Sequence, residues 1–167
     1  MALWSDGTGA LYVRKGSLRY LQPTYVGYNS SKFGATHNWE IHDHAQRFEV
    51  GGRQTAAIAG QCAVLAWLET TIGYDWLFQR IAELNIYAYK RLKEIPGLTV
   101  LTPKAGQSGI LTFTITGIDE TEVVKRLLEQ HIAIRSIPAN HSLRVSTGFY
   151  NTRAEIDKLA DTLCTIR

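Results

Sequence analysis

In the second half of the chain, segments that alternate apolar and polar residues, as strands do, are followed by segments with apolar residues at helical spacing. The clearest strand lies at 111–116, where Leu, Phe and Ile alternate with three threonines, as in a strand buried on one face. Further short strands are predicted at 98–101, 132–135 and 143–145. Asp119 and Thr152 each precede an apolar run of helical spacing, with a glutamate three positions later as in a capping box. The order β, β, α, β, β, α predicts an α+β layer with antiparallel strands and both helices on one face.

The first half of the chain is less regular. Residues 10–13 predict a short strand, and residues 27–49 lack apolar periodicity, which predicts a long loop. Residues 54–70 are apolar on every side, so we expect a helix buried against another layer. Residues 74–94 repeat apolar side chains at helical spacing, and Pro96 with the following glycine ends that helix.

Composition narrows the classes of protein. The chain has 167 residues, 45% of them hydrophobic and 20% charged, which is typical of one globular domain rather than a disordered chain. A net charge of +3, scattered along the sequence, argues against nucleic-acid binding. The two cysteines, Cys62 and Cys164, are too few for a disulfide framework. The longest apolar run, at 56–68, is shorter than a membrane span, and no signal peptide is visible. We therefore expect a cytoplasmic protein with no membrane partner.

Arg144 is the first candidate for ligand binding. It lies on the strand face opposite Leu143 and Val145, where a guanidinium can hold a carboxylate through two parallel hydrogen bonds. Arg135, on the preceding strand, could converge on the same anion. The pattern alone favours an exposed surface arginine at Arg144 and is equally compatible with one at Arg135, since most arginines are exposed.

Of two glycine pairs in the chain, one suggests a contact with phosphate. Gly51 and Gly52 are adjacent, and backbone amides at such a turn can approach a phosphate closely, although a plain turn before the helix is the alternative. The Gly-x-Gly at Gly7–Gly9 precedes a predicted strand instead of following one, so it is no dinucleotide-binding fingerprint.

Three histidines lie in the predicted loop together with two acidic residues. These residues are His37, Glu40, His42, Asp43 and His44. Their spacing matches no metal motif on a helix or strand, so we expect a solvated loop and no metal site.

Four segments of the chain carry a family resemblance. They are Asp6-Gly-Thr-Gly-Ala-Leu-Tyr-Val13 with Gln22-Pro-Thr-Tyr-Val-Gly27, Arg47-Phe-Glu-Val-Gly-Gly52, residues 84–103 with Ile95-Pro-Gly97, and Leu143-Arg-Val-Ser-Thr-Gly-Phe-Tyr-Asn-Thr152 with Glu155-Ile-Asp157. In this order they resemble class V aminotransferase-like enzymes that depend on pyridoxal phosphate (PLP), in the branch of cysteine lyases, cysteine desulfurases and isopenicillin epimerases. The last segment is the most specific. Together the four span nearly the whole chain.

The resemblance implies the C-terminal small domain of a fold-type I PLP-dependent transferase, with a remnant of the large domain at the N-terminus. We expect residues 1–50 to be that remnant, 51–94 linking helices and 95–167 the small α+β domain. The resemblance also implies that Arg144, with Arg135, binds the carboxylate of a small amino-acid substrate. Gly51 and Gly52 would contact the cofactor phosphate, although Gly52 replaces a threonine that the family often has.

The family's Schiff-base lysine belongs to a Gly-His-Lys-Trp type motif just before the glycine-rich strand, and this chain begins about where that motif would end. None of the seven lysines lies in a setting that lowers a lysine pKa, so we assign no catalytic residue and expect no covalent PLP.

We expect an inert fragment of a C–S-cleaving or aminotransferase-like enzyme that forms a homo-oligomer such as a homodimer. A non-catalytic oligomerisation or binding module and one half of a split PLP enzyme are the alternatives.

Overall fold

The computed structural model describes residues 7–33 and 38–166, and the chain divides into two compact units between Trp67 and Leu68. We call residues 7–67 the N-terminal unit and residues 68–166 the C-terminal unit, and each is described by itself. The division into three parts predicted from the sequence stays a prediction.

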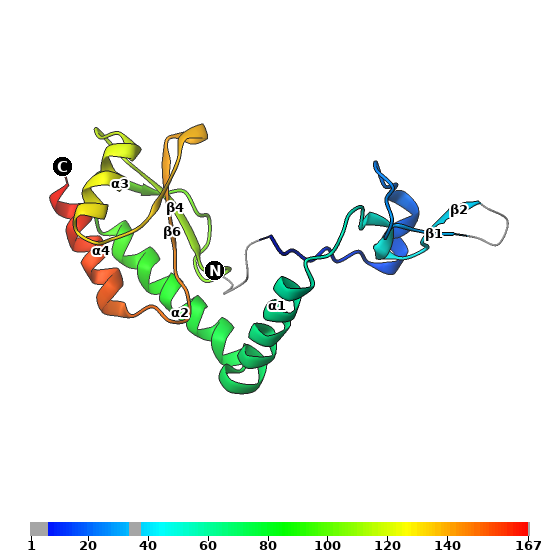
Figure 1. Cartoon of the computed structure of the whole chain (residues 1–167). Helices are drawn as coiled ribbons and strands as arrows, with labels where there is room; N and C mark the ends of the chain where they lie inside the picture. The colour runs from blue at the N-terminus through cyan, green and yellow to red at the C-terminus, as the bar shows by residue number, and fades with distance from the viewer. Residues whose placement is uncertain (1–6, 34–37, 167) are drawn as a thin grey trace. The chain divides into compact units, whose positions relative to one another are not determined.

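A four-stranded sheet with helices on one face forms the C-terminal unit (Figure 1). Its strands are β3 (Leu98–Val100), β4 (Ile110–Ile115), β5 (Arg135–Ile137) and β6 (Ser142–Ser146). Their order in the sheet is β3-β4-β6-β5, and each neighbouring pair is antiparallel. Its helices are α2 (Tyr74–Lys93), α3 (Glu120–Glu129) and α4 (Arg153–Thr165). This confirms the predicted α+β layer.

The strand register explains which face is buried. Leu111 and Phe113 of β4 are fully buried, and the latter lies opposite Leu143 of β6. Thr112 and Thr114 alternate with them and are only half-buried. The threonine side of the sheet is therefore the face that the helices leave open, because successive side chains of a strand point to opposite faces.

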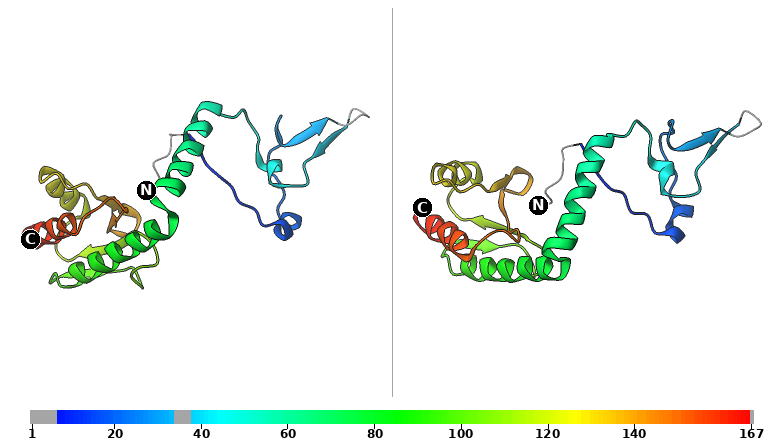
Figure 2. Two further views of the ribbon diagram at one scale, coloured as in Figure 1. Left: turned by 90° about the horizontal axis from the view of Figure 1, so that it is seen from below. Right: turned by 60° about the horizontal axis from the view of Figure 1, so that its bottom comes forward.

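Helices α2 and α4 run alongside each other against the buried face, as Figure 2 shows for the C-terminal unit. Leu84 and Leu92 of α2, Val123 and Leu127 of α3, and Leu163 of α4 join the sheet in one apolar core. Burial of this apolar surface is the main force that holds the unit together.

The helix ends follow the predicted signals. The Thr152 hydroxyl accepts a hydrogen bond from the Glu155 amide, and the Glu155 carboxylate accepts one from the Thr152 amide, which completes a capping box. Asp119 caps α3 by accepting hydrogen bonds from the amides of Thr121 and Glu122. The C-terminus of α3 ends in a Schellman motif, with His131 in the left-handed region at φ +59°.

The N-terminal unit is built from short elements. They are the 3-10 helices η1 (Lys15–Tyr20) and η2 (Ala45–Phe48), the antiparallel hairpin β1 (Ser31–Phe33) with β2 (Trp39–Ile41), and the helix α1 (Thr55–Trp67). The hairpin lies inside the segment predicted as a loop, so that prediction was wrong there. Residues 10–13 form no strand in the structure, which corrects a second prediction.

Helix α1 is also less buried than its sequence predicts. Gln61 is its only buried residue, although the helix is apolar on every side. The helical stretch continues through the π-helical turn η3 (Leu68–Ile72) up to Gly73, whose φ is +82°. The prediction that this helix is buried is therefore wrong for the chain by itself.

Thr55–Ile72 is, among the described residues, the one helical stretch long and apolar enough to cross a membrane by length and composition alone. The prediction that no apolar run reaches this length was wrong, because the helix extends beyond residue 68. A single such helix is weak support for a membrane span, since core helices of soluble proteins meet the same criteria.

Candidate functional site

The two predicted substrate-binding arginines lie side by side on the open face of the sheet. Arg135 of β5 is directly opposite Arg144 of β6, and Thr112 of β4 is opposite Arg144 on its other side. Directly opposite residues of antiparallel strands have Cβ atoms about 4.5–5.5 Å apart. The structure thus brings together two arginine residues that are nine positions apart in the sequence.

The surroundings of this arginine pair favour an anion. Arg144 is half-buried, and its Nε–H is buried without a hydrogen-bond acceptor. Neither arginine forms an ion pair with the residues that the structure describes. Two like charges placed directly opposite each other destabilise a sheet, and a buried donor without a partner adds a further cost. A bound carboxylate would remove both costs.

Several residues of the most specific sequence motif support the fold instead of the ligand site. The Asn151 side chain accepts a hydrogen bond from the Gly148 amide, and the backbone carbonyl of Asn151 accepts one from Arg80. The Asp157 carboxylate accepts hydrogen bonds from the Tyr87 hydroxyl at 2.6 Å and from Arg91 Nε at 2.9 Å.

Sequence reasoning missed this link between α2 and α4, because its partners are about 70 residues apart. The hydrogen bond from Tyr87 is the main cause that holds the pKa of the Asp157 carboxyl below its ordinary value, and Arg91 lowers it further. The same hydrogen bond raises the pKa of Tyr87.

The predicted phosphate-binding glycines belong to the N-terminal unit. Gly51 and Gly52 are exposed, and a Cβ atom added to either would meet no other atom within 4 Å. They border a hollow of about 610 Å³ together with Gly9, Gln46 and Arg53. The Gly51 carbonyl accepts a hydrogen bond from the Asn29 side chain at 2.7 Å.

Arg47, which opens the second segment of the resemblance, has a structural role in the same unit. Its Nε donates to the His42 carbonyl at 2.8 Å, and its guanidinium also reaches the Leu18 carbonyl at 3.4 Å. Arg47 thus connects η2 by hydrogen bonds to the residue that follows β2 and to η1.

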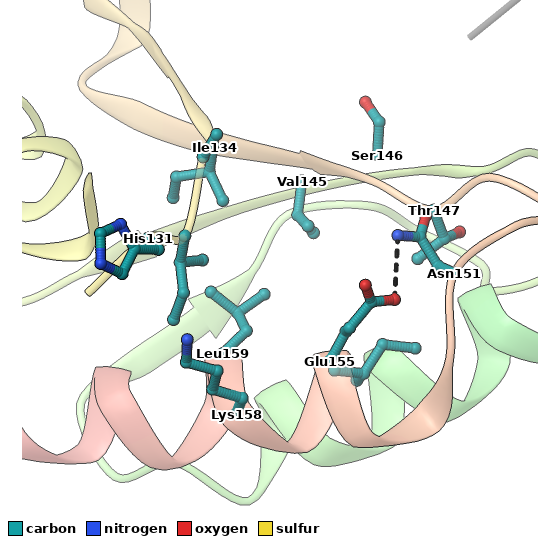
Figure 3. Close-up of a pocket in the computed structure, with 12 residues that line it drawn as sticks. His131, Ile134, Val145, Ser146, Thr147, Asn151, Glu155, Lys158 and Leu159 are labelled. Carbon is teal, nitrogen blue, oxygen red and sulfur yellow. Dashed lines mark hydrogen bonds between the residues drawn. The ribbon is translucent and has the colours of Figure 1, made fainter. Parts of the chain in front are cut away.

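Figure 3 shows the residues around a hollow of about 290 Å³ in the C-terminal unit, and neither Arg135 nor Arg144 lines it. It is lined on one side by Ile134 and Val145 and on the other by α4. Three of the polar side chains that line it already have partners: Glu155 in the capping box, Lys158 on the Gln130 carbonyl, and Thr147 on the Gly109 carbonyl. We therefore assign no ligand to this hollow.

The histidines of the N-terminal unit do not gather into a ligand set. The rings of His42 and His44 stack with centroids 5.0 Å apart, and His44 Nδ1 accepts a hydrogen bond from the Gln46 amide. Within residues 7–33 and 38–166, no group of three His, Cys, Asp or Glu side chains could hold a metal ion. His37 lies outside the described residues.

All seven lysine side chains are exposed in this chain. They are Lys15, Lys32, Lys90, Lys93, Lys104, Lys125 and Lys158. None therefore has the desolvated surroundings that a Schiff-base lysine requires. The assignment of no catalytic lysine stays a prediction.

Comparison with known proteins agrees with this arrangement. The model of the family "Aminotransferase class-V" matches residues 4–159. The chain belongs to the class-V aminotransferase family. Probable cysteine desulfurases of Staphylococcus aureus (strain Mu50 / ATCC 700699) and Staphylococcus epidermidis (strain ATCC 12228 / FDA PCI 1200) are each 25% identical over 173 residues. Each alignment covers 96% of this chain and 42% of the relative, so the chain spans about two fifths of their length.

Solved structures of a cystine C–S lyase and of a cysteine desulfurase show the same fold. The cystine C–S lyase C-DES in complex with its product cysteine persulfide has a TM-score of 0.77 and 26% identity, over 92% of this chain and 41% of that one. The cysteine desulfurase CsdA from Escherichia coli has a TM-score of 0.72 at 22% identity, over 93% of this chain and 41% of that one, which shows the fold alone. A C-DES variant carries glycine covalently linked to its PLP cofactor, so relatives in this family bind PLP.

The residues of this chain fit PLP chemistry in part. The arginine pair, with its unpartnered Nε–H, suits a substrate carboxylate, and the open Gly51–Gly52 turn leaves space for a phosphate. The exposed lysines do not suit the covalent anchor. The arginine pair and the glycine turn are thus the groups that suit an anion, and that the chain lacks a covalent anchor stays a prediction.

Proposed function

We propose that the C-terminal unit is the substrate-carboxylate-binding part of a PLP-dependent cysteine lyase or cysteine desulfurase-like enzyme, and that this chain alone is catalytically inert. The observation that carries the proposal is the cross-strand pair of Arg135 and Arg144 with its buried, unpartnered Nε–H. The likeness to cysteine desulfurases and to a cystine C–S lyase supports sulfur-containing amino acids as the substrate class.

Each arginine has a distinct role in this proposal. Arg144 is half-buried on the inner strand β6, so it would hold the α-carboxylate through two parallel hydrogen bonds and fix its orientation. Arg135 is exposed on the edge strand β5 and would add a second positive charge beside the same anion. When bound, PLP supplies the electron sink for cleavage at the substrate's Cβ–S bond.

The positions of the cysteines favour a lyase over sulfur transfer to a thiol of this segment. Cys164 lies on α4, at the helix side of the sheet, whereas Cys62 lies on α1 of the N-terminal unit, and both are exposed. Transfer of sulfur to a protein thiol needs that thiol within reach of the substrate sulfur. No cysteine occurs between Arg135 and Ser146, the segment that carries the arginine pair.

An NMR titration of the whole chain tests the carboxylate proposal. L-Cysteine should shift the Nε–H signal of Arg144 and the amides of β5 and β6, whereas cysteamine, which lacks the carboxylate, should not. The Arg144→Gln variant should lose this response. Arg14→Gln, which removes an exposed arginine of the other unit, is the matched control and should keep it. Equal shifts with cysteamine, or an unchanged response in Arg144→Gln, would contradict the proposal.

Inertness can be tested separately with the cofactor. The chain is mixed with PLP and L-cysteine, and sulfide and pyruvate release are measured. We expect neither product above the rate of PLP alone. Borohydride reduction followed by peptide mass spectrometry should then find only scattered modification of the exposed lysines. Stoichiometric labelling of one lysine, together with product release, would overturn the inert assignment.

A non-catalytic assembly module is the second candidate, and helix α1 is the observation that favours it. An apolar helix whose only buried residue is Gln61 leaves much apolar surface uncovered in the chain by itself. Another copy of the chain could cover it, and so could a cofactor domain on a separate polypeptide, as in a split enzyme.

Mixing this chain with a class-V cofactor domain distinguishes the assembly module from the split enzyme. C–S cleavage should appear in the mixture only if the chain is one half of a split enzyme.

A further inference from the structure

We infer that Asn29 and Gly27 are positioning residues for the Gly51–Gly52 loop, and that they hold its backbone amides ready for the phosphate of the cofactor. The inference rests on the proposed function, because it takes the phosphate from the PLP assignment. Neither residue was a candidate from the sequence. Both belong to the N-terminal unit, as does the loop that they hold.

Gly27 allows the backbone of the loop to approach closely. A Cβ atom at this position would lie 1.9 Å from the carbonyl oxygen of Val50 and 2.8 Å from its carbonyl carbon. No side chain larger than hydrogen therefore fits unless Val50 and the two glycines that follow it move. Close approach of two backbone segments, and not a left-handed conformation, is the reason for glycine here.

Asn29 holds the loop from the same turn. Its Nδ2 donates a hydrogen bond to the Gly51 carbonyl at 2.7 Å, across 22 positions of sequence. The Asn29 side chain thereby fixes the orientation of the peptide group between Gly51 and Gly52. Because that peptide group also carries the Gly52 N–H, the direction of this amide is set by the same bond.

The turn that carries both residues is itself rigid. The fully buried Ser30 hydroxyl accepts a hydrogen bond from the Gly27 amide at 2.7 Å and donates to the Gly27 carbonyl at 2.9 Å. The Ser30 carbonyl accepts a hydrogen bond from the His42 amide, which joins the turn to the end of β2. The turn is therefore a fixed support, whereas adjacent glycines alone would leave the loop mobile.

Two substitutions test this inference on the full chain. Asn29→Asp keeps the size of the side chain but removes the donor, so the Gly51 carbonyl loses its partner. Asn38→Asp adds the same charge at an exposed asparagine of the hairpin region and is the matched control. Gly27→Ala is the stronger perturbation, because its Cβ cannot fit against Val50.

The readouts are the ¹H–¹⁵N heteronuclear NOE of the Gly51 and Gly52 amides and the affinities for pyridoxine phosphate and for pyridoxine. These alcohols avoid reaction with lysines. We expect Asn29→Asp to lower the two NOEs and to weaken pyridoxine phosphate binding by about threefold to tenfold, the range for one lost hydrogen bond. Pyridoxine binding and the melting temperature should stay unchanged. Asn38→Asp should match the wild type in every readout.

The outcomes separate the inference from the proposed function. Unchanged NOEs in both Asn29→Asp and Gly27→Ala would overturn the positioning role, whatever the ligand does. Lowered NOEs with no loss of pyridoxine phosphate affinity would overturn the link to the phosphate. If the wild type shows no preference for pyridoxine phosphate over pyridoxine, the cofactor assignment of this loop fails, and the NOEs still decide whether Asn29 positions it.

Discussion

His131 occupies the left-handed position that ends α3, where glycine is the usual residue. The amides of His131 and Ile132 complete the Schellman motif by donating to the Leu128 and Leu127 carbonyls, both at 2.9 Å. A side chain with a Cβ is strained in this region, and glycine is not. The motif therefore forms here despite an unfavourable residue, because the core contact of the neighbouring Ile132 favours it.

His131→Gly should thus stabilise the C-terminal unit by about 0.5–1 kcal/mol, the size of effect seen when backbone strain of this kind is relieved. Urea denaturation followed by circular dichroism measures the change. His131→Ala keeps the Cβ and is the control, with no gain in stability expected. An equal gain in both variants would show that the imidazole, and not the backbone strain, is the cause.

The Tyr87–Asp157–Arg91 contact predicts a defined pH dependence. The contact lowers the pKa of Asp157, so its contribution is present above the unfolded carboxyl pKa of about 4 and is lost as pH falls through the folded value. It raises the pKa of Tyr87, so that contribution is present below about pH 10 and is lost as pH rises through the folded value.

Tyr87→Phe should therefore be less stable than the wild type between about pH 5 and 9, and the difference should shrink towards both extremes. Thermal melts at a series of pH values measure it. Tyr89→Phe, on the same helix and without this carboxylate partner, should show no such pH window. A difference for Tyr87→Phe that is constant from pH 3 to 9 would contradict the assignment.

At the scale of the element, the capping box of α4 joins the most specific sequence motif to the fold. The amide of Thr152 is the main cause that lowers the pKa of Glu155, which keeps this carboxylate charged at the helix N-terminus. The cap also directs the chain from the end of β6 into α4. The motif is thus explained by the cap at Thr152 and Glu155 and by contacts of Asn151 and Asp157 with α2, and ligand binding is proposed only for Arg144.

Thr152→Ala should destabilise the C-terminal unit by about 1 kcal/mol, the usual value for a lost N-cap. Thr162→Ala is the control on the same helix. Its hydroxyl donates to the Lys158 carbonyl within the helix, a contact that contributes little, so its removal should be neutral or slightly stabilising. Urea denaturation of the two variants side by side provides the comparison, and equal losses would argue against a specific cap.

The elements of the C-terminal unit could be predicted from the sequence because their signals are local. Alternation at 111–116 and the caps at Asp119 and Thr152 each depend on a few neighbouring residues, and the structure has these elements within one or two positions. The strand expected at 132–135 lies instead at Arg135–Ile137. The position of this short edge strand is set by its pairing with β6 and not by its own apolar pattern.

The N-terminal unit was predicted less well because its order depends on contacts that are distant in sequence. The β1–β2 hairpin was missed, since its strands have three residues each and little alternation. The roles of Gly27 and Asn29 depend on their contacts with Val50 and Gly51, which are distant in the sequence. The sequence offered convergence of Arg135 and Arg144 as one of two alternatives, whereas the unpartnered Nε–H could be found only in the structure.

At the scale of the whole molecule, the uncovered apolar surface of α1 predicts association. Ile58 and Trp67 are both more than 40% exposed, in a helix whose composition is that of a buried one. Light scattering should give a mass above the 18.7 kDa of one chain, rising with concentration. Ile58→Gln with Trp67→Gln should lower it, whereas Leu128→Gln, at an exposed apolar site on α3, should not. A monomer at all concentrations would contradict this prediction.

The central claim is that Arg144 recognises the carboxylate of a sulfur-containing amino acid through the geometry of its guanidinium. The most direct test is the ratio of affinities for L-cysteine and cysteamine in the wild type and in Arg144→Lys, measured by NMR titration. Lysine keeps the charge but loses the two parallel donors. We predict that the wild type prefers L-cysteine and that Arg144→Lys lowers the ratio about tenfold, as expected for the loss of a charge-assisted hydrogen bond. An unchanged ratio would contradict the claim.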